Sequence, residues 1–346
     1  MHEILLVQDS GSLDDVLENK RINDWLTGLA PHPKRQNLPH GADAEIVDID
    51  NPYNFLAIST DTIGEEIEAG LYSDPYAIGW VTVMANFSDL AAVGATPLGF
   101  LLSVSWPKHA SISYIAGVRD GISDACRECQ TYVIGGDTNS SRELSLTGCA
   151  VGLVPKERLV TRTGMQPGDI IYLTHPAGAG NLSAARLLIS DQIPDRPYRP
   201  VARLREGRVL AGHASSCMDT SDGVLATLDQ LARINDTGIN IEKDLNSLVL
   251  PEALATTIPS CAFLAGYHGE YELVFSIPTE QNELFLKEAE ALSWTPVPIG
   301  KATQGGKVSH RGKAINTKYL RNLVDEVDSD PRRYVELLLG FCTNLA

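Results

Sequence analysis

Five aspartates stand where an apolar strand or helix gives way to small residues, and carboxylates in such places suit a hard metal ion. They are Asp43 in GAD, Asp61 in STDT, Asp89 in NFSDLAAVGA, Asp137 in GGDT and Asp222 in TSDG. Magnesium prefers carboxylate oxygens and binds best where phosphates supply further ligands. Glycines beside these aspartates let backbone amides approach phosphate oxygens closely, at Gly135, Gly136 and Gly223. The pattern indicates a site for magnesium and phosphate.

Each motif taken alone also has a simpler explanation. GGD and SDG commonly form turns or helix caps, which would account for Asp137 and Asp222. Asp89 is different, because it lies within an apolar stretch of helical spacing, where an unpartnered carboxylate would be costly. It therefore needs a partner or a metal. Spacing alone does not show that the five carboxylates converge.

The common phosphate-binding and kinase signatures are absent from the sequence. It has no GxxxxGK[ST] loop, no GxGxxG that follows a strand, and no HRD or DFG motif. A phosphotransferase with this sequence would belong to a less common architecture.

The elements that must position these residues alternate between strand and helix patterns. The first half has strands at 55–60, 98–106, 131–134 (running into Gly135) and 143–154, and helices at 75–93 and 112–129. A polar, Gly- and Pro-containing stretch at 155–168 suggests a boundary. The second half has strands at 169–174, 238–242 and around 297 and 308, and helices at 181–190, 201–213, 224–235 and 280–292. The prediction is an α/β (α+β) protein with domains at 1–155 and 156–346.

Charge and hydrophobicity indicate which partners and which cellular compartment the sequence favours. Acidic residues outnumber basic ones, 44 to 28, for a formal net charge of −16, which disfavours nucleic acid. We see no basic start followed by an apolar stretch and no run long enough for a bilayer, so we expect a cytoplasmic protein without a membrane partner. Cys126 and Cys129 form a CxxC, but no second pair completes a metal site, which favours ordinary packing.

Five motifs in a fixed order give the chain a resemblance to a known family. NFSDLAAVGATP at 86–97, IGGDT at 134–138, TRTGMQPGD at 161–169, MDTSDGV at 218–224 and GEYELVF at 269–275 resemble those of the thiamine-monophosphate kinase family. That family lies within the superfamily of aminoimidazole-ribonucleotide synthetase and selenophosphate synthetase. The resemblance spans roughly residues 41 to 303.

The resemblance implies a two-domain aminoimidazole-ribonucleotide-synthetase-like fold whose N-terminal domains pair in a homodimer. It implies ATP in the cleft between domains, several Mg²⁺ ions, and direct in-line transfer of the ATP γ-phosphate to a small acceptor. Carried over by motif, Asp89 and Asp222 would be catalytic, and the metal ligands would be Asp43, Asp61, Asp89, Asp137 and Asp222. The nucleotide would lie near Gly135, Gly136, Asp137, Arg162 and Ser221. Arg162 could equally be an exposed arginine in a linker.

The departures from the family pattern fall towards the acceptor. Ala42 stands where the family has the first of two adjacent aspartates, and Glu68 and Ala69 stand where it has His-Phe. The family's GGEDYEL appears as HGEYEL at 268–273, which shifts or removes the acidic pair. The predicted acceptor contacts are Glu65, Glu68, His268, Glu270 and Tyr271. These changes motivate the hypothesis that the acceptor is a small polar or cationic metabolite other than thiamine monophosphate.

Two further functions stay open at this point. One is an ATP-dependent synthetase of the same superfamily, and the other is a regulatory protein with a degenerate nucleotide site, which the loss of a carboxylate at Ala42 favours. A reactive cysteine at the tail would indicate the dehydratase branch of the superfamily. Cys342 is near the C-terminus but has no flanking signature, so a packing role is expected.

Overall fold

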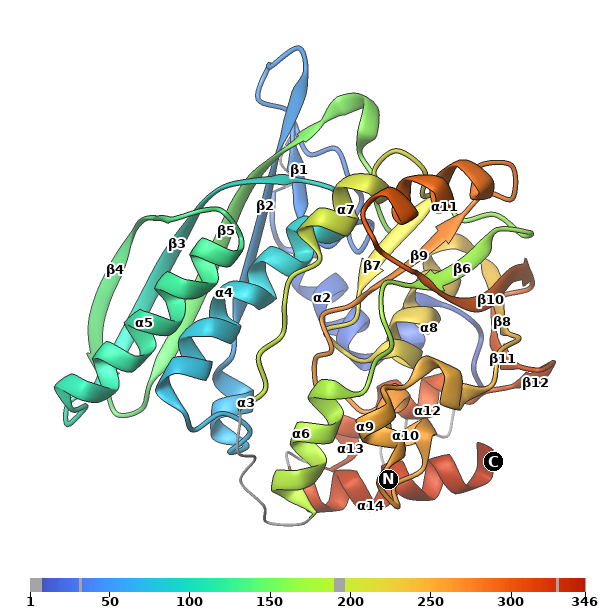
Figure 1. Ribbon diagram of the computed structural model, residues 1–346. Helices are drawn as coiled ribbons and strands as arrows, with labels where there is room; N and C mark the ends of the chain where they lie inside the picture. Colours follow the sequence, from blue (N-terminus) through green and yellow to red (C-terminus); the bar gives the residue numbers. More distant parts are fainter. Residues whose placement is uncertain (1–7, 31–32, 190–196, 328–329, 346) are drawn as a thin grey trace.

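The computed structural model describes residues 8–30, 33–189, 197–327 and 330–345 (Figure 1). Its first half is built on a five-stranded sheet in the order β1-β2-β5-β3-β4. The strands are β1 (Glu45–Val47), β2 (Asn54–Thr62), β3 (Thr96–Pro107), β4 (Val133–Ser141) and β5 (Ser145–Pro155). Neighbours are antiparallel except β3 and β4, which are parallel and joined by a helix, as a parallel pair requires.

Two long helices, α4 (Pro75–Ala92) and α5 (Ile112–Glu128), pack closely in this half (Figure 1). Asp74 caps α4 by accepting a hydrogen bond from the Ala77 amide at 2.7 Å. Glycines set the close approach of the two helices, since a Cβ on Gly79 or Gly121 would lie 2.0 Å from a carbonyl oxygen of the other helix. Fourteen of the 18 residues of α4 are buried, because α4 also contacts β7 and α7 of the second half.

The second half is built on a seven-stranded sheet in the order β12-β11-β8-β10-β6-β9-β7. The strands are β6 (Ile170–Leu173), β7 (Ser216–Asp219), β8 (Thr237–Ile241), β9 (Leu273–Ile277), β10 (Val297–Gln304), β11 (Val308–His310) and β12 (Lys313–Ala314). Helix α8 (Val224–Asn235) packs against β7, β8, β9 and β11. Phe285 of α11 (Asn282–Ala291) packs against Tyr172 and Phe275 of this sheet, with ring centroids 5.5–5.7 Å apart.

The remaining helices complete the described chain. They are η1 (Leu13–Asp15), α2 (Leu17–Thr27), α3 (Gly64–Glu68), η2 (Lys156–Arg158), α6 (Ala179–Leu188), α7 (Leu204–Leu210), η3 (Leu245–Leu248), α9 (Pro251–Leu254), α10 (Ser260–Ala265), α12 (Thr317–Arg321), α13 (Leu323–Glu326) and α14 (Pro331–Leu345). Across the described residues, no helix combines the length and the apolar character that crossing a membrane needs.

The N-terminal helix is tied to the second half of the chain. The amide of Leu17 donates to Asn322 at 2.8 Å, and the side chains of Asn19 and Gln230 exchange hydrogen bonds. Arg233 of α8 binds the carboxylate of Asp9. The predicted division into 1–155 and 156–346 stays a prediction, and these contacts show that residues 9–19 pack on the later half.

One strand extends further than predicted. The sequence suggested a strand at 131–134 that ends at the glycine pair, but β4 continues through Gly135, Gly136 and Asp137 to Ser141. These residues pair with Leu101, Leu102 and Ser103 of β3. A Cβ on Gly136 would lie 1.9 Å from the Leu102 carbonyl oxygen. Glycine at 136 is thus required for the approach of the two strands.

Candidate functional site

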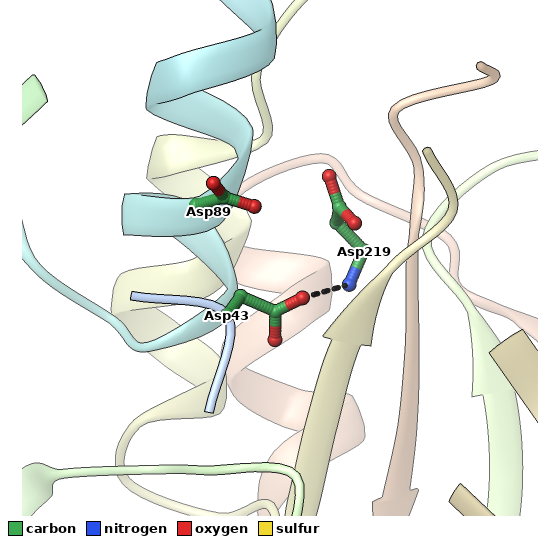
Figure 2. Close-up of side chains that lie close together, drawn as sticks. All are labelled: Asp43, Asp89 and Asp219. Carbon is green, nitrogen blue, oxygen red and sulfur yellow. Dashed lines mark hydrogen bonds between the residues drawn. The ribbon is translucent and has the colours of Figure 1, made fainter. Parts of the chain in front are cut away.

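Three aspartates from distant parts of the chain meet between the two sheets (Figure 2). Asp43 precedes β1, Asp89 lies on α4, and Asp219 ends β7. One carboxylate oxygen from each lies within 4.8 Å of the others. The Asp219 amide donates to Asp43 Oδ1 at 3.4 Å and so connects the end of β7 to the segment before β1.

Two oxygens of this cluster have no partner although they are buried. Asp43 Oδ2 and Asp219 Oδ2 make no hydrogen bond to any described residue. The side chain of Asp43 is fully buried, and Asp219 is 1% exposed. Leaving such oxygens unsatisfied costs free energy, and hard cations bind through carboxylate oxygens. The donor set therefore fits Mg²⁺.

Asp61 and Asp222 line the same cavity as the cluster. This cavity, of about 670 Å³, is also lined by Asp43, Asp89 and Arg162. Asp61 lies near the end of β2, and Asp222 lies in the turn that leads into α8. In that turn Gly223 has φ 92°, and a Cβ there would lie 2.3 Å from the Gly266 carbonyl oxygen.

Burial and mutual repulsion raise the pKa values of these carboxyls. Burial, with the charges of Glu66 and Asp222, raises the pKa of Asp61 to about 7. Burial also raises the pKa values of Asp219 and Asp222 to about 7, and that of Asp89 well above its usual range. A site that holds so many carboxyls with raised pKa values favours a multivalent cation, which would stabilise their charged forms.

Asp89 and Arg162 have partners within the site. The hydroxyl of Ser59 donates to Asp89 Oδ2, which supplies the partner that the apolar helix predicted. Arg162 Nη2 donates to Asp43 Oδ1 at 2.9 Å, and the Arg162 side chain is 17% exposed. The interpretation of Arg162 as an exposed linker arginine is therefore wrong. Ser221 donates its hydroxyl to Asp219 Oδ1 at 3.0 Å and so orients that carboxylate.

Three of the predicted site residues lie apart from this cavity within the chain. Gly135, Gly136 and Asp137 belong to β4, the exposed edge of the first sheet. Asp61 and Gly136 share one row across the sheet, separated by β5 and β3. Three strand spacings place that part of β4 about 14 Å away. The described chain does not bring Asp137 to the cluster, and its predicted role as a metal ligand stays a prediction.

A larger cavity of about 920 Å³ adjoins the first. The two share Glu18, Glu65, Glu66, Tyr267 and Arg321 in their linings. Two predicted acceptor contacts, Glu68 and His268, line the larger cavity, and Glu65 lines both. Its wall is otherwise largely apolar and is formed by α6, α10 and α14.

Glu270 and His268, two of the predicted acceptor contacts, are hydrogen-bonded within the protein, and Tyr271 has an unusual backbone conformation. The buried carboxylate of Glu270 accepts hydrogen bonds from the amides of Gly178, Gly180 and Asn181 at 2.9–3.2 Å and so caps α6. Tyr271 lines the smaller cavity and has φ 54°, an uncommon conformation for a bulky residue. The imidazole of His268 bonds to the Tyr72 hydroxyl at 3.1 Å, and burial lowers its pKa to about 4.

Comparison with known proteins agrees with this geometry. The family described as AIR synthase related protein, N-terminal domain, matches residues 41–154. The thiamine-monophosphate kinase of Pyrococcus horikoshii is 30% identical over 69% of this chain and 77% of its own length. That of Escherichia coli K12 is 33% identical over 64% of this chain and 71% of its own length. This chain belongs to the thiamine-monophosphate kinase family.

The fold agrees with the family as well. A solved structure of AaThiL complexed with AMPPCP and TMP superimposes with a TM-score of 0.68 at 25% identity, covering 80% of this chain and 89% of that one. The aminoimidazole-ribonucleotide-synthetase-like fold expected from the motifs is thereby confirmed.

One residue of the site in this member of the thiamine-monophosphate kinase family was missed by the motif reading. Asp219 is the first aspartate of DTSDG, and the motif pattern predicted the second, Asp222. Asp219 ends the buried strand β7, but the residues before it, ASSCM, form no clear apolar run. The two aspartates lie three residues apart, and the sequence does not tell which one faces the cluster.

Proposed function

We propose that the protein transfers the γ-phosphate of ATP to the phosphate of thiamine monophosphate, with Mg²⁺ bound at the aspartate cluster. The observation that carries this proposal is the convergence of Asp43, Asp89 and Asp219 within 4.8 Å, with two buried oxygens unpartnered. A site of this kind suits a metal-bound polyphosphate better than a neutral ligand. Family membership supports the same activity, since the matched relatives are thiamine-monophosphate kinases.

The metal would be held by Asp43, Asp89 and Asp219, with Asp61 and Asp222 on the wall of the same cavity. Bound there, Mg²⁺ supplies neutralisation of the charge on the phosphate oxygens. The residues of the chain position the two phosphates, since in-line phosphoryl transfer needs orientation and charge balance more than covalent help. In this scheme Asp89 and Asp222 act through the metal and not as nucleophiles.

Arg162 is a cation that the chain itself supplies to the cavity beside the aspartate cluster. Its guanidinium donates to Asp43 through one nitrogen, while Nε has no hydrogen-bond partner among the described residues. A guanidinium with a free donor beside a phosphate site can bind a phosphate oxygen. We assign Arg162 to the nucleotide phosphates, and Ser221 to holding Asp219 in place.

The acceptor body belongs in the larger cavity on this proposal. Thiamine monophosphate is the first candidate, because of the family and because AaThiL was solved with AMPPCP and TMP. A second candidate is a smaller cationic phosphate ester. Glu68 lines the larger cavity and Ala69 follows it, so that carboxylate and methyl groups stand where the family has His-Phe.

We also propose a homodimer that pairs through the first sheet. Every residue of β4 from Val133 to Ser140 is exposed, and β4 is an edge strand with free hydrogen-bonding groups. Val133 and Ile134 are 45% and 48% exposed. Burying this edge against a second copy would remove an aggregation hazard, and it would place Asp137 at or near the interface.

The test is ADP release from ATP and Mg²⁺, with and without thiamine monophosphate, for the wild type and Asp89→Asn. Asp120→Asn is the matched control, because Asp120 is an exposed carboxylate on α5 outside both cavity linings. We expect stimulation by thiamine monophosphate that Asp89→Asn abolishes and Asp120→Asn retains, with a new phosphoanhydride signal in ³¹P NMR. Magnesium-dependent ATP binding without turnover would contradict the thiamine monophosphate assignment. A phosphate ester that restores turnover would then identify the second candidate, and failure of every acceptor would favour a regulatory nucleotide-binding protein.

A further inference from the structure

We propose that Cys261 and Cys342 are a redox-active thiol pair that closes to a disulfide and fastens the C-terminal helix to the wall of the larger cavity. The Cys342 thiol donates to the Cys261 sulfur at 2.7 Å, although 81 residues separate the two in sequence. Both side chains are buried, at 4% and 1% exposure. Both cysteines are free thiols whose sulfur atoms are in contact.

The pair lies behind the wall that it would fasten. Cys261 belongs to α10, which lines the larger cavity through Ala262 and Phe263, and Cys342 belongs to α14, which lines it through Tyr334 and Leu338. α14 is the last element of the chain and runs along the bottom of the view in Figure 1. A cross-link near its end would fix one wall of the cavity against the other.

A second contact holds the other end of α14. The Tyr267 amide donates to the hydroxyl of Tyr334, which precedes Cys342 on the same helix, at 2.9 Å. The hydrogen bond anchors the first turn of α14, and the thiol pair lies near its last turn. The two contacts lie near opposite ends of α14. Closing the disulfide would therefore reduce the mobility of α14 without moving the helix to a new position.

The chemistry balances with a small-molecule disulfide as oxidant. A thiolate of the pair attacks the oxidant, one thiol of the oxidant leaves, and the second protein thiolate displaces the other. One S–S bond breaks and one forms, the protein loses two hydrogens, and two small thiols are released. A disulfide bond is about 2.0 Å long, so the two sulfurs need to approach by about 0.7 Å from their separation of 2.7 Å.

Access for the oxidant comes from the end of the helix. Cys342 lies three residues before Leu345, the last residue of α14, and the final turn of a helix frays readily. Opening of that turn exposes the Cys342 sulfur while α10 keeps Cys261 in place. Oxidation should accordingly be slower than that of an exposed thiol.

The CxxC in the sequence differs from this pair in geometry. Cys126 and Cys129 lie at the end of α5, where the Cys129 thiol donates to the Met84 sulfur at 3.7 Å and not to Cys126. Burial raises the pKa of Cys126, and the hydrogen bond to Cys261 together with burial raises that of Cys342, so the two pairs are distinguished by the contact between their sulfurs and not by thiolate formation. The spacing that suggests a redox pair in sequence is thus a packing feature, and the two cysteines far apart in sequence meet.

The experiment exposes the reduced full-length protein to glutathione disulfide under native conditions and maps its peptides without reduction. We expect a linked peptide pair containing residues 261 and 342, lighter by two hydrogens, in the wild type and in the matched control Cys129→Ser. Cys261→Ser and Cys342→Ser should lack it. The oxidised protein should gain on the order of 5 °C in its melting midpoint, with slower hydrogen exchange in α14, and dithiothreitol should reverse both.

Two outcomes would overturn the proposal, and neither depends on the activity of the protein. One is glutathione attached separately to Cys261 and Cys342 without a linked peptide. The other is a linked peptide from Cys126 and Cys129 in place of the predicted one. Because the wild-type peptide map decides between them, the result does not require that the serine variants fold.

Discussion

The smaller cavity, of about 670 Å³, and the larger, of about 920 Å³, share Glu65 and Glu66 but differ in what surrounds a ligand. The smaller one lies beside the aspartate cluster, in which Asp43 and Asp219 each keep one buried oxygen without a hydrogen bond to any described residue, so that this cavity suits a cation. The larger one has an apolar wall from α6, α10 and α14 with carboxylates such as Glu65 and Glu68 at its rim. Next to this wall, His268 and Glu270 are hydrogen-bonded to the protein. We call the aspartate cluster the reactive end of the site, and the hydrogen-bonded groups around the larger cavity its frame.

Replacing Asp89 by Asn gives the largest expected effect and tests the reactive end. ADP release should fall at least about 100-fold, because a metal ligand and its charge are lost where charge neutralisation drives transfer. The melting midpoint without metal should stay the same or rise, since burial and three neighbouring aspartates already raise the pKa of Asp89. A variant that unfolds while Asp120→Asn does not would assign Asp89 to the frame.

Replacing Glu270 by Ala tests the frame. The amides of Gly178, Gly180 and Asn181 would lose their acceptor, which should lower the free energy of unfolding by about 2–3 kcal/mol, measured by denaturant titration. Binding of ATP and Mg²⁺, measured by calorimetry, should persist in the folded variant. Loss of acceptor binding with unchanged stability would instead support the sequence prediction that Glu270 contacts the acceptor.

The pH dependence of folding stability should also distinguish the two cavities. Asp61, Asp219 and Asp222 have pKa values of about 7 in the folded protein, so the folded state binds more protons than the unfolded one between the usual carboxyl pKa of about 4 and pH 7. Stability without metal should therefore fall as pH rises through this range and level off near pH 8, and the last part of the fall, from pH 6.5 to 8, should be about 1–2 kcal/mol for this coupled set. Magnesium should flatten the trend, and Asp219→Asn should weaken it. His268, whose pKa of about 4 lies below the usual value, affects stability only below this window.

Restoring the family's residues in the double variant Glu68→His and Ala69→Phe addresses the larger cavity. An aromatic contact is worth about 0.5–1.5 kcal/mol, so the KM for thiamine monophosphate should fall about 2- to 10-fold with little change in kcat. Steady-state kinetics with a series of acceptor concentrations would show it. An unchanged KM would place the acceptor away from α3.

The smallest effect is expected from Asp137→Asn, which lies outside both cavity linings. Its exposed carboxylate accepts from Asn139 at 2.7 Å, and the stability change should be within about 0.5 kcal/mol. A loss of activity with stability kept would mean that a second copy carries Asp137 to the site. Sedimentation at several concentrations should then show a dimer.

The sequence predicted two of the three clustered aspartates, Asp43 and Asp89, and did not predict Asp219. A carboxylate in an apolar helix conflicts with burial, and that conflict is visible in the sequence around Asp89. The helix at 224–235 was also predicted with its observed bounds, since its apolar residues repeat with helical spacing. Cap and wall contacts such as Glu270 on α6 leave no local signal, because their partners lie about 90 residues away.

The tie between the N-terminal helix and the second half has a consequence for the order of assembly. Leu17 and Asn19 bind Asn322 and Gln230, groups that the ribosome adds 305 and 211 residues later. While the chain is being made, α2 can form its local contact between Asn23 and His40, but not its contacts with the second half. Pairings this distant in sequence form late in folding. Helix α2 should therefore be among the last elements to dock on the second half, and because Glu18 and Asn19 line the smaller cavity, that cavity is completed only then.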